Sequence, residues 1–277
     1  MAVELEIHDG DPWWDSPDIW TVPGSDPEGA AGSPIAGTTC YLWANVTNNG
    51  KSSVENATVR FYWADPSVGF DRTTANLIGS SNVNLAAGAS TEVLCLTPWI
   101  PDFVNEGHEC VLAEAYHSSL DPLPAVPDFN VSSDRHVAQR NLSVVMALRS
   151  YFSFPFTVFN TVRMERRFKL RVRQGKLSEL TRASRRWGIV SPQVEGRLGQ
   201  TALVSDRCTN ELMLDKAAGC KHQDSEFSMQ GNSRRALTLI GRVEGGSALL
   251  HVEQLYRDRI VGGLSILIRS EPQRDKA

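Results

Sequence analysis

The sequence lacks any long apolar run. Among its 277 residues, no stretch approaches the roughly 20 consecutive apolar residues that a membrane-spanning helix needs. Residues 1–11 contain no basic segment followed by an apolar one, so they lack the pattern of a secretory signal. These two absences predict that the chain has no membrane span and favour a cytoplasmic location.

Cysteine is scarce and widely spaced. The chain has five cysteines and no Cys-x-x-Cys pair, which argues against a zinc ribbon or a thioredoxin-like redox site. A disulfide between Cys40 and Cys110 and a set of buried free thiols both stay open. The missing secretory pattern favours the thiols, because structural disulfides belong to oxidising compartments.

Motifs of common enzyme classes are also missing. There is no Gly-x-Ser-x-Gly elbow, no Walker A loop and no dinucleotide fingerprint followed by a helix. His108, Cys110, His117 and Asp121 lie in one expected strand and its exit, but His117 has the opposite parity to the first two. The four side chains therefore do not converge locally, and we predict no metal site, no catalytic residue and no cofactor.

What is present is a succession of short strand-like segments with turn signals between them. Hydrophobic residues make up 41% of the chain, enough for a packed core, and no convincing helical period occurs in the first half. Period-two alternation and turn residues such as Asn48-Asn49-Gly50 favour antiparallel strands. The expected strands are 39–47, 57–64, 77–85, 90–96, 108–116 and 138–146.

Several of these segments together resemble the CARDB-type bacterial Ig-like domain. The similarity covers roughly residues 15–145 and lies in the runs 43–50, 56–63, 85–93, 99–101, 107–114 and 133–141. The resemblance implies a non-catalytic Ig-like module of the kind found in larger bacterial proteins and associated with adhesion or domain presentation. It also implies an extracellular setting, which stays open beside the cytoplasmic one.

Charge is distributed unevenly along the chain. Residues 1–145 hold 5 Lys+Arg against 19 Asp+Glu, a formal charge of −14, whereas residues 146–277 hold 23 against 13, or +10. Six of the seven tryptophans precede residue 100. Such a shift predicts two units with different surfaces. We place an acidic, Trp-rich domain at 1–146 and a basic one at 147–277.

The second half also favours strands. These are expected at 236–243, 247–256 and 260–268, with a bulge at Gly262-Gly263. Leu177–Trp187 is expected to be a short helix, 196–232 to be rich in loops, and the apolar join near 146–156 to carry no Gly/Ser linker. The predicted fold class is therefore all-β, with two tandem antiparallel β-sandwiches, the first of them Ig-like.

The most regular segment is 162–174, which alternates almost strictly. Its odd positions form a predominantly basic face, with Arg163, Glu165, Arg167, Lys169, Arg171 and Arg173. Three interpretations are open for this face: a solvated strand face, a nucleic-acid surface, or a face that docks on the acidic first unit or on an acidic surface of another subunit. We favour docking over nucleic acid, because no RNP motif, zinc finger or recognition helix is visible.

A second candidate lies near the start of the chain, where four aspartates at 9, 11, 15 and 18 surround Trp13, Trp14 and Trp20. The spacing is not that of an EF-hand, so a Ca²⁺ site is disfavoured. The three indoles either pack on the sandwich or form a platform for sugars, with packing favoured.

We therefore expect a non-catalytic interaction or scaffolding module rather than an enzyme. Its partner would be another protein or another subunit, bound through sheet faces and loops. The expected contact residues are Arg163, Arg167, Lys169, Arg171 and Arg173, followed by Trp13, Trp14 and Trp20. A carbohydrate-binding adhesin and an accessory domain of a hydrolase are the alternatives.

Overall fold

A computed structural model describes residues 2–64, 67–68, 72, 75–101, 110–125, 129–148, 150–160, 162–180, 187, 189, 194–205 and 224–270. Within these ranges the regular elements are strands and one 3-10 helix, η2, at Leu177–Leu180. The predicted all-β fold class is confirmed. No helix in these ranges is long and apolar enough to cross a membrane.

The chain forms two compact units, each assembled from three segments. Unit 1 comprises Met1–Asp65, Phe70–Asn141 and Thr181–Val190. Unit 2 comprises Pro66–Gly69, Leu142–Leu180 and Ser191–Ala277. The units are therefore not simple consecutive halves of the sequence, and each is described separately below.

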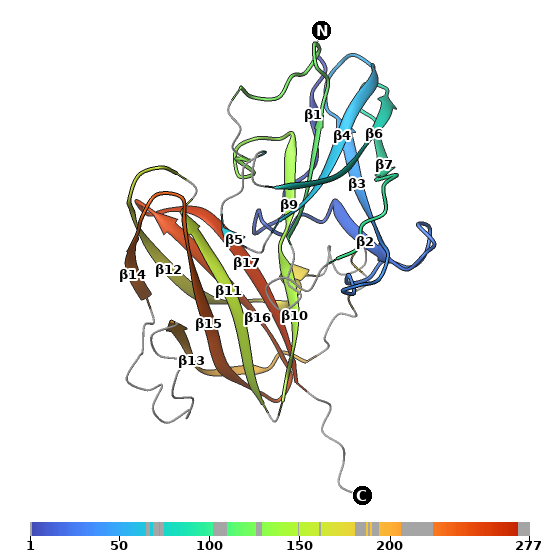
Figure 1. Ribbon diagram of the computed structural model, residues 1–277. Coiled ribbons are helices and arrows are strands. Elements are labelled where there is room, and N and C mark those ends of the chain that lie inside the picture. Colours follow the sequence, from blue (N-terminus) through green and yellow to red (C-terminus); the bar gives the residue numbers. More distant parts are fainter. Residues whose placement is uncertain are drawn as a thin grey trace, which may run out of the picture. The chain divides into compact units, whose positions relative to one another are not determined.

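Unit 1 is an Ig-like sandwich of two antiparallel sheets (Figure 1). In one sheet, β3 (Cys40–Asn48) pairs with β1 (Leu5–Glu6) and β2 (Ile19–Pro23) along one side and with β7 (Ser90–Leu94) along the other. The other sheet has the order β6 (Asn76–Leu85), β4 (Val54–Ala64), β8 (Cys110–Tyr116) and β9 (Val137–Arg140).

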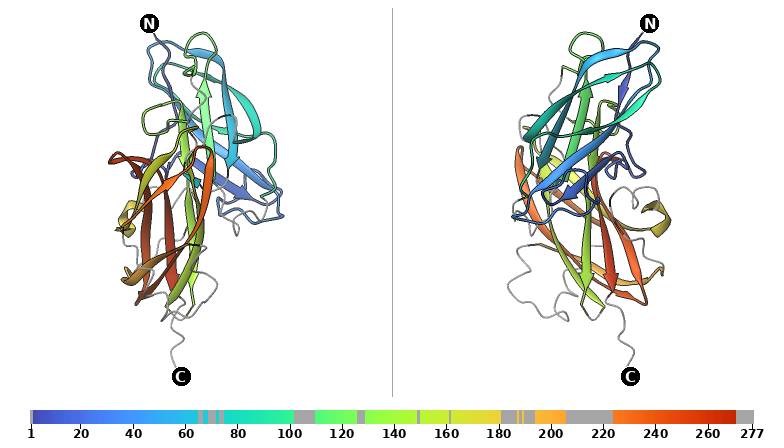
Figure 2. Two further views of the ribbon diagram at one scale, coloured as in Figure 1. Left: turned by 60° about the vertical axis from the view of Figure 1, so that its left-hand side comes forward. Right: turned by 90° about the vertical axis from the view of Figure 1, so that its right-hand side faces the viewer.

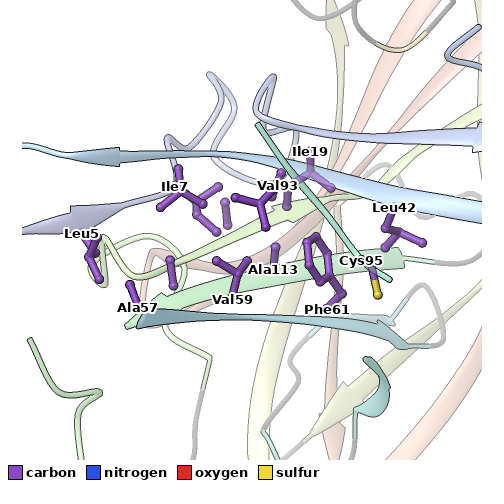
Figure 3. Close-up of a cluster of buried hydrophobic side chains, with 14 of the residues drawn as sticks. Leu5, Ile7, Ile19, Leu42, Ala57, Val59, Phe61, Val93, Cys95 and Ala113 are labelled. Carbon is purple, nitrogen blue, oxygen red and sulfur yellow. The ribbon is translucent and has the colours of Figure 1, made fainter. Parts of the chain in front are cut away.

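The alternation of the strands builds the core of unit 1. In β3, Cys40, Leu42, Ala44 and Val46 are all buried on one face while the residues between them are partly exposed. Figure 3 shows Leu42 on one layer and Phe61 on the other directed into the same interior. Period two thus places one apolar row of each strand in the space between the sheets.

One expected strand in this region is split. The segment 138–146 forms β9 and then β10 (Leu142–Ala147), which belong to different sheets. The break falls at Asn141, whose N–H donates to the carbonyl of Trp14 instead of continuing a ladder. The strand expected at 108–116 is present as β8 from Cys110 to Tyr116, and residues 108–109 lie outside the described ranges.

Unit 2 is a second two-layer sandwich (Figure 2). One sheet has the order β10, β17 (Arg259–Ser270), β16 (Ser247–Tyr256), β12 (Arg166–Gly175), β14 (Asp224–Met229), and the other has β13 (Arg197–Ser205), β15 (Ser233–Glu244), β11 (Tyr151–Asn160), β5 (Ser67–Val68). The pairing is antiparallel except for β10 with β17 and β5 with β11, which run parallel. The expected bulge near Gly262 is present as a register shift between β16 and β17.

The second half contains more strand than the sequence predicts. The apolar join contains a full strand, β11, whose Phe152, Phe154 and Phe156 are buried in the core. The stretch expected to be loop-rich contains β13 and β14, and a register shift after Leu198 interrupts the alternation that would have revealed β13. The short helix expected from Leu177 is a single 3-10 turn in the described part of that segment.

The cysteines of the described ranges are not bridged. Cys40, Cys95 and Cys110 are buried free thiols, so a Cys40–Cys110 disulfide is absent. Burial raises the pKa of the Cys110 thiol well above its usual value, which keeps this sulfur in its unreactive protonated form. The other two cysteines lie outside the described ranges.

Candidate interaction face on unit 2

The strand β12 separates an apolar face from a charged one. Phe168 and Leu170 are buried in the core of unit 2, and the alternate side chains of Arg167, Lys169 and Arg171 point to the opposite side of the sheet. This confirms the alternation that the sequence predicts. The cations at the odd positions of β12 therefore share one face of the five-stranded sheet, and Arg166 has the opposite parity.

Arg163 is not part of that strand. β12 begins at Arg166, four residues later than expected, and Arg163 is exposed in the preceding bend. The cause is the buried side chain of Asn160, whose amide donates to the carbonyls of Met164 and Met229 at 2.9 and 3.0 Å. These bonds hold the chain in a turn where a longer strand would otherwise run. Arg163 is thus separated from the regular row.

The remaining arginines have carboxylate partners on neighbouring strands. Arg167 lies 2.7 Å from Glu226 of β14, in a pair that is mostly exposed. Arg171 and Arg173 each donate from Nε to a different oxygen of Glu253 on β16, at 2.6 and 2.7 Å. Two cations thus bind one carboxylate, so this part of the face keeps an excess of positive charge.

Glu253 differs from its partners in exposure. Its side chain is only 2% exposed, while Arg171 and Arg173 are 45% and 38% exposed. A buried carboxylate is costly unless charge-assisted hydrogen bonds replace its water, and both of its oxygens have such bonds here. Glu253 therefore fixes two guanidinium groups at the surface in defined positions.

A row of buried polar side chains continues beside this cluster. His251 of β16 lies 2.8 Å from Ser265 Oγ of β17 through Nδ1, and 2.9 Å from Glu179 Oε2 of η2 through Nε2. Because a carboxylate only accepts, Nε2 carries the hydrogen in the neutral ring and Nδ1 accepts from Ser265. Burial and the nearby Arg173 lower the pKa of His251, which favours this neutral form.

Glu179 is the partly exposed end of the row. Burial opposes its ionisation, but hydrogen bonds from the Lys176 N–H and from His251 lower its pKa below the usual value. Gly175 of β12 makes room for the ring, since a Cβ at that position would collide with His251. Together these contacts attach η2 to the outer side of the sheet.

The order serine, histidine, carboxylate is that of a nucleophile with its base and orienting acid. Here Ser265 and His251 are fully buried, so the Ser265 oxygen has no access to a substrate in this structure. Sequence reasoning did not find this row, because the three residues are spread over 87 positions of a chain without an elbow motif. These hydrogen bonds connect η2 to β16 and β17.

The three tryptophans expected in second place lie in unit 1 and differ in exposure. Trp14 and Trp20 are buried, at 1% and 8% exposure, and Trp13 is partly exposed. Trp13 meets Trp14 edge to face at 5.3 Å, whereas Trp20 stacks on Trp43 at 5.9 Å. They therefore form two separate ring pairs, and Trp13 is the indole of the three that offers ring surface to solvent.

Unit 1 also contains a buried arginine. Arg140 is 6% exposed, lies over the Trp187 ring at 4.7 Å and donates to Thr21 at 3.2 Å. Burial lowers its pKa to about 10, against the opposing effect of Asp15. The Trp187 indole in turn donates to the Ile19 carbonyl at 2.8 Å. These contacts join Trp187 to β2 and β9 within unit 1.

Two further charged clusters of unit 1 surround single side chains. Glu114 is fully buried and bound by Tyr62, Arg60 and Arg72. His136 lies between Asp134 at 2.7 Å and Asp121 at 3.1 Å. Burial opposes protonation of His136, but the hydrogen bonds of these two carboxylates raise its pKa above the usual value.

Of the four residues weighed as a metal set, three can be located. Cys110 is buried in β8, His117 accepts the Leu120 N–H in a turn, and Asp121 binds Arg135 and His136. His108 lies outside the described ranges. In the part of the chain that the structure describes, no group of three or more His, Cys, Asp or Glu side chains could hold a metal ion.

Comparison with known proteins gives no family. No protein-family model and no curated protein matches the chain. Among solved structures, the CARDB domain of the PF1109 protein from Pyrococcus furiosus, in complex with di-metal ions, is 15% identical with a TM-score of 0.28, over 50% of this chain and 90% of that one.

Two other similar structures cover more of this chain. The CupB6 tip adhesin from Pseudomonas aeruginosa is 10% identical with a TM-score of 0.24, over 97% of this chain and 98% of that one. Red sea bream transglutaminase is 9% identical with a TM-score of 0.23, and the chain spans about a third of its length, 32%. These similarities include binding domains and an enzyme, and they carry no argument about function.

Proposed function

We propose that this protein is a non-catalytic interaction module that binds an acidic protein surface, or an acidic surface of another subunit, through the outer face of β12. The contact residues are Arg163, Arg167, Lys169, Arg171 and Arg173. The observation that supports this is the pair of half-exposed guanidinium groups held by the buried Glu253. Their positions are set before any partner arrives, which lowers the entropy lost on binding.

The charge of the face supports the same partner chemistry. Glu253 offsets one of the two arginines that bind it, and Arg163 is exposed in the bend before the strand. A guanidinium that binds Glu253 through some of its five N–H groups still has others for a second carboxylate. Complementary acidic side chains would therefore be steered to this face and fixed in register by it.

Two parts of the proposal concern organisation. We propose that unit 1, which takes up most of residues 1–146, is a CARDB-type Ig-like domain, and that unit 2, which takes up most of residues 147–277, is a basic β-sandwich domain. The strand order of unit 1 supports the first, and the charge difference between the halves supports the second. Of the three tryptophans expected as secondary contacts, only the partly exposed Trp13 is kept in this proposal, because Trp14 and Trp20 are buried.

Binding to labelled poly-glutamate, followed by fluorescence anisotropy at low and physiological salt, tests the contact face. We expect the double variant Arg163→Glu and Lys169→Glu to weaken binding at least about tenfold, with a shallower salt dependence. Both positions avoid the Glu253 cluster, so the fold is retained. Arg234→Glu, an exposed charge reversal on β15 of the other sheet, is the matched control. Equal binding by all three proteins would refute the proposed face.

A further inference from the structure

The strand β6 ends its sheet and has an open side. Within the described ranges its ladder partner is β4, and the sheet order places no further strand beyond it. Ser80, Asn82 and Asn84 are exposed along it, while Ser81 and Leu85 point into the sandwich. A strand at such an edge presents backbone N–H and C=O groups that an added strand can pair with.

The composition of β6 sets it apart from the other edge strands. Its ten residues, Asn76–Leu85, include no charged residue and no proline. The other edges of the described chain carry protective features: β7 contains Glu92, β13 begins with Arg197, β14 contains Asp224 and Glu226, and β2 ends in Pro23.

The remaining edges are short. β1 and β5 have two residues each, and β9 has four, all buried. β10 is also uncharged but has six residues and is followed almost at once by β11. Charges, proline and short length are the usual means by which proteins keep edges from pairing. β6 is the longest described edge strand that has none of them.

The middle of β6 is regular and bordered by exposed apolar side chains. Its register with β4 is unbroken from Gly79 to Val83, between shifts at either end. Leu77 on β6 is 58% exposed, and Leu96 is 73% exposed next to Thr97, whose side chain meets the Gly79 position. A strand added beside Gly79–Val83 would cover part of this apolar surface.

The lack of charge points to a particular occupant. When two identical strands pair antiparallel about a two-fold axis, residues on one side of the axis face residues on the other side of it in the copy, so two like charges placed symmetrically about the axis meet each other. On β14, pairing centred on Ser225 would bring Asp224 of each copy against Glu226 of the other. On β6 it brings together Ser, Asn, Val and Leu side chains, which pair without repulsion.

We propose that two copies of this chain associate through β6, whose Gly79–Val83 segments pair antiparallel and join two four-stranded sheets into one. This surface belongs to unit 1, whereas the contact face proposed above belongs to unit 2. The two proposals therefore fail independently. The occupant is a second copy of the chain, and a strand from a different protein is the alternative outcome.

Sedimentation velocity of the full chain over a wide concentration range tests the association. We expect a monomer–dimer equilibrium. We also expect Asn82→Lys to raise the dissociation constant at least about tenfold, because the new cations of the two copies would lie close together on the paired strands and repel each other. Asn130→Lys, at an exposed position outside the strand, is the matched control and should leave the equilibrium unchanged. Circular dichroism of both variants checks that they remain folded.

Hydrogen exchange locates the contact. In the wild-type chain, amides of Asn76–Leu85 should exchange more slowly at high concentration than at low concentration, while those of β13 and β14 should not change. A chain that stays monomeric at the highest soluble concentration overturns the proposal. So does a dimer whose β6 amides exchange at a concentration-independent rate, or one that Asn82→Lys leaves intact.

Discussion

The two units each bury a glutamate between two arginines, and they do so to different depths. In unit 1, Glu114 is fully buried, and its partners Arg72 and Arg60 are 15% and 39% exposed. In unit 2, Glu253 is as well buried, and Arg171 and Arg173 are 45% and 38% exposed. Glu114 and Arg72 therefore form an interior ion pair, whereas Glu253 supports two surface cations.

The histidines of the units differ in a parallel way. His136 lies between two carboxylates, whose hydrogen bonds outweigh its burial, whereas His251 has one carboxylate, one hydroxyl and a nearby cation, Arg173. Burial acts against the charged form in both. Neighbouring carboxylates therefore outweigh burial at His136, but they do not at His251.

The largest expected effect comes from removing Arg72 from its ion pair with Glu114 in unit 1. Arg72→Met should lower the free energy of unfolding by about 3 kcal/mol, because a buried carboxylate loses a partner that water cannot replace. Arg171→Met should cost only about 1 kcal/mol, since that arginine is exposed and Glu253 keeps Arg173. Urea unfolding of both variants measures the difference. Equal losses of unfolding free energy would contradict the contrast between the interior ion pair of Arg72 and the surface position of Arg171.

A buried acid without a matching cation gives the next effect, of opposite sign. Burial, Glu6 and Asp134 raise the pKa of Asp9 to about 8, and its Oδ1 has no hydrogen-bond partner among the described residues. A raised acid pKa gives a contribution that is present at low pH and is lost as the pH rises toward 8. Asp9→Asn should therefore stabilise the protein at pH 7–8 by about 2 kcal/mol and have little effect near pH 4.

This prediction is checked by thermal unfolding at the two pH values. Asp11→Asn, at an exposed neighbouring position, is the control and should not change the melting temperature at either pH. If the wild type and Asp9→Asn show the same pH dependence of the melting temperature, the surroundings of Asp9 do not raise its pKa.

The packing of the His251 ring against Gly175 in unit 2 is tested by substituting the glycine. Gly175→Ala places a methyl group against the His251 ring and should destabilise the protein by about 1–2 kcal/mol. Gly245→Ala is not a suitable comparison, because Gly245 has a positive φ of 73°. The exposed Gly199 is the better control, because a methyl group there meets backbone and Cβ atoms of Arg242 at 3.3–3.4 Å, a tight but milder contact. If both alanine variants unfold alike, the ring does not fill the space beside Gly175.

The two histidines should give opposite pH profiles of smaller size. The raised pKa of His136 means that its contribution is present below the unfolded pKa and is lost as the pH rises through the folded value. Asp121, Asp134 and Arg135 are the charged groups that face it. NMR titration of the imidazole signals should place the His136 midpoint above 6.5.

For His251 the sign is reversed. Its lowered pKa means that its contribution is present above the unfolded pKa and is lost as the pH falls through the folded value. Glu179, Glu253 and Arg173 are the charged groups around it, with Ser265 on the other ring nitrogen. Its midpoint should lie below 6.5 and rise in Arg173→Met. A midpoint that Arg173→Met leaves unchanged would remove the assigned cause.

The smallest effect is expected at the exposed pair of Arg167 and Glu226. Arg167→Met should change the free energy of unfolding by less than about 0.5 kcal/mol, because both side chains are largely in water. The same urea experiment that measures Arg171→Met gives this value. A loss of unfolding free energy as large as that of Arg171→Met would show that the exposed pair of Arg167 and Glu226 stabilises the protein as much as the pair of Arg171 and Glu253.

Much of the fold could be predicted, because a half-buried strand shows its two faces in the order of its residues. The alternation of β3 and β12 and the long hairpin of β16 and β17 were found in this way. β11 and β13 were not. In β11, phenylalanines and a proline form one apolar run, and in β13 a register shift interrupts the period.

The candidate site could be predicted only in part. The basic residues of β12 were recognised, but their partners Glu253 and Glu226 are about 60–80 positions away on strands whose neighbours the pattern does not specify. Packing of the tryptophans was favoured, but the sequence did not show which of them is buried, nor did it show the row of Ser265, His251 and Glu179. In each case the deciding contact lies between strands, and no local period records it.

The order of residues by itself determined the strand character of this protein, the inward and outward faces of its strands and the uneven charge of its halves, since these follow from period two and composition. The tertiary structure alone decided which strands are neighbours, and with that which charges meet and which tryptophans are covered. The physical reason is that burial and pairing depend on distances between segments far apart in the chain. Loop closure allows many such segments to meet, so the local sequence does not determine which of them do.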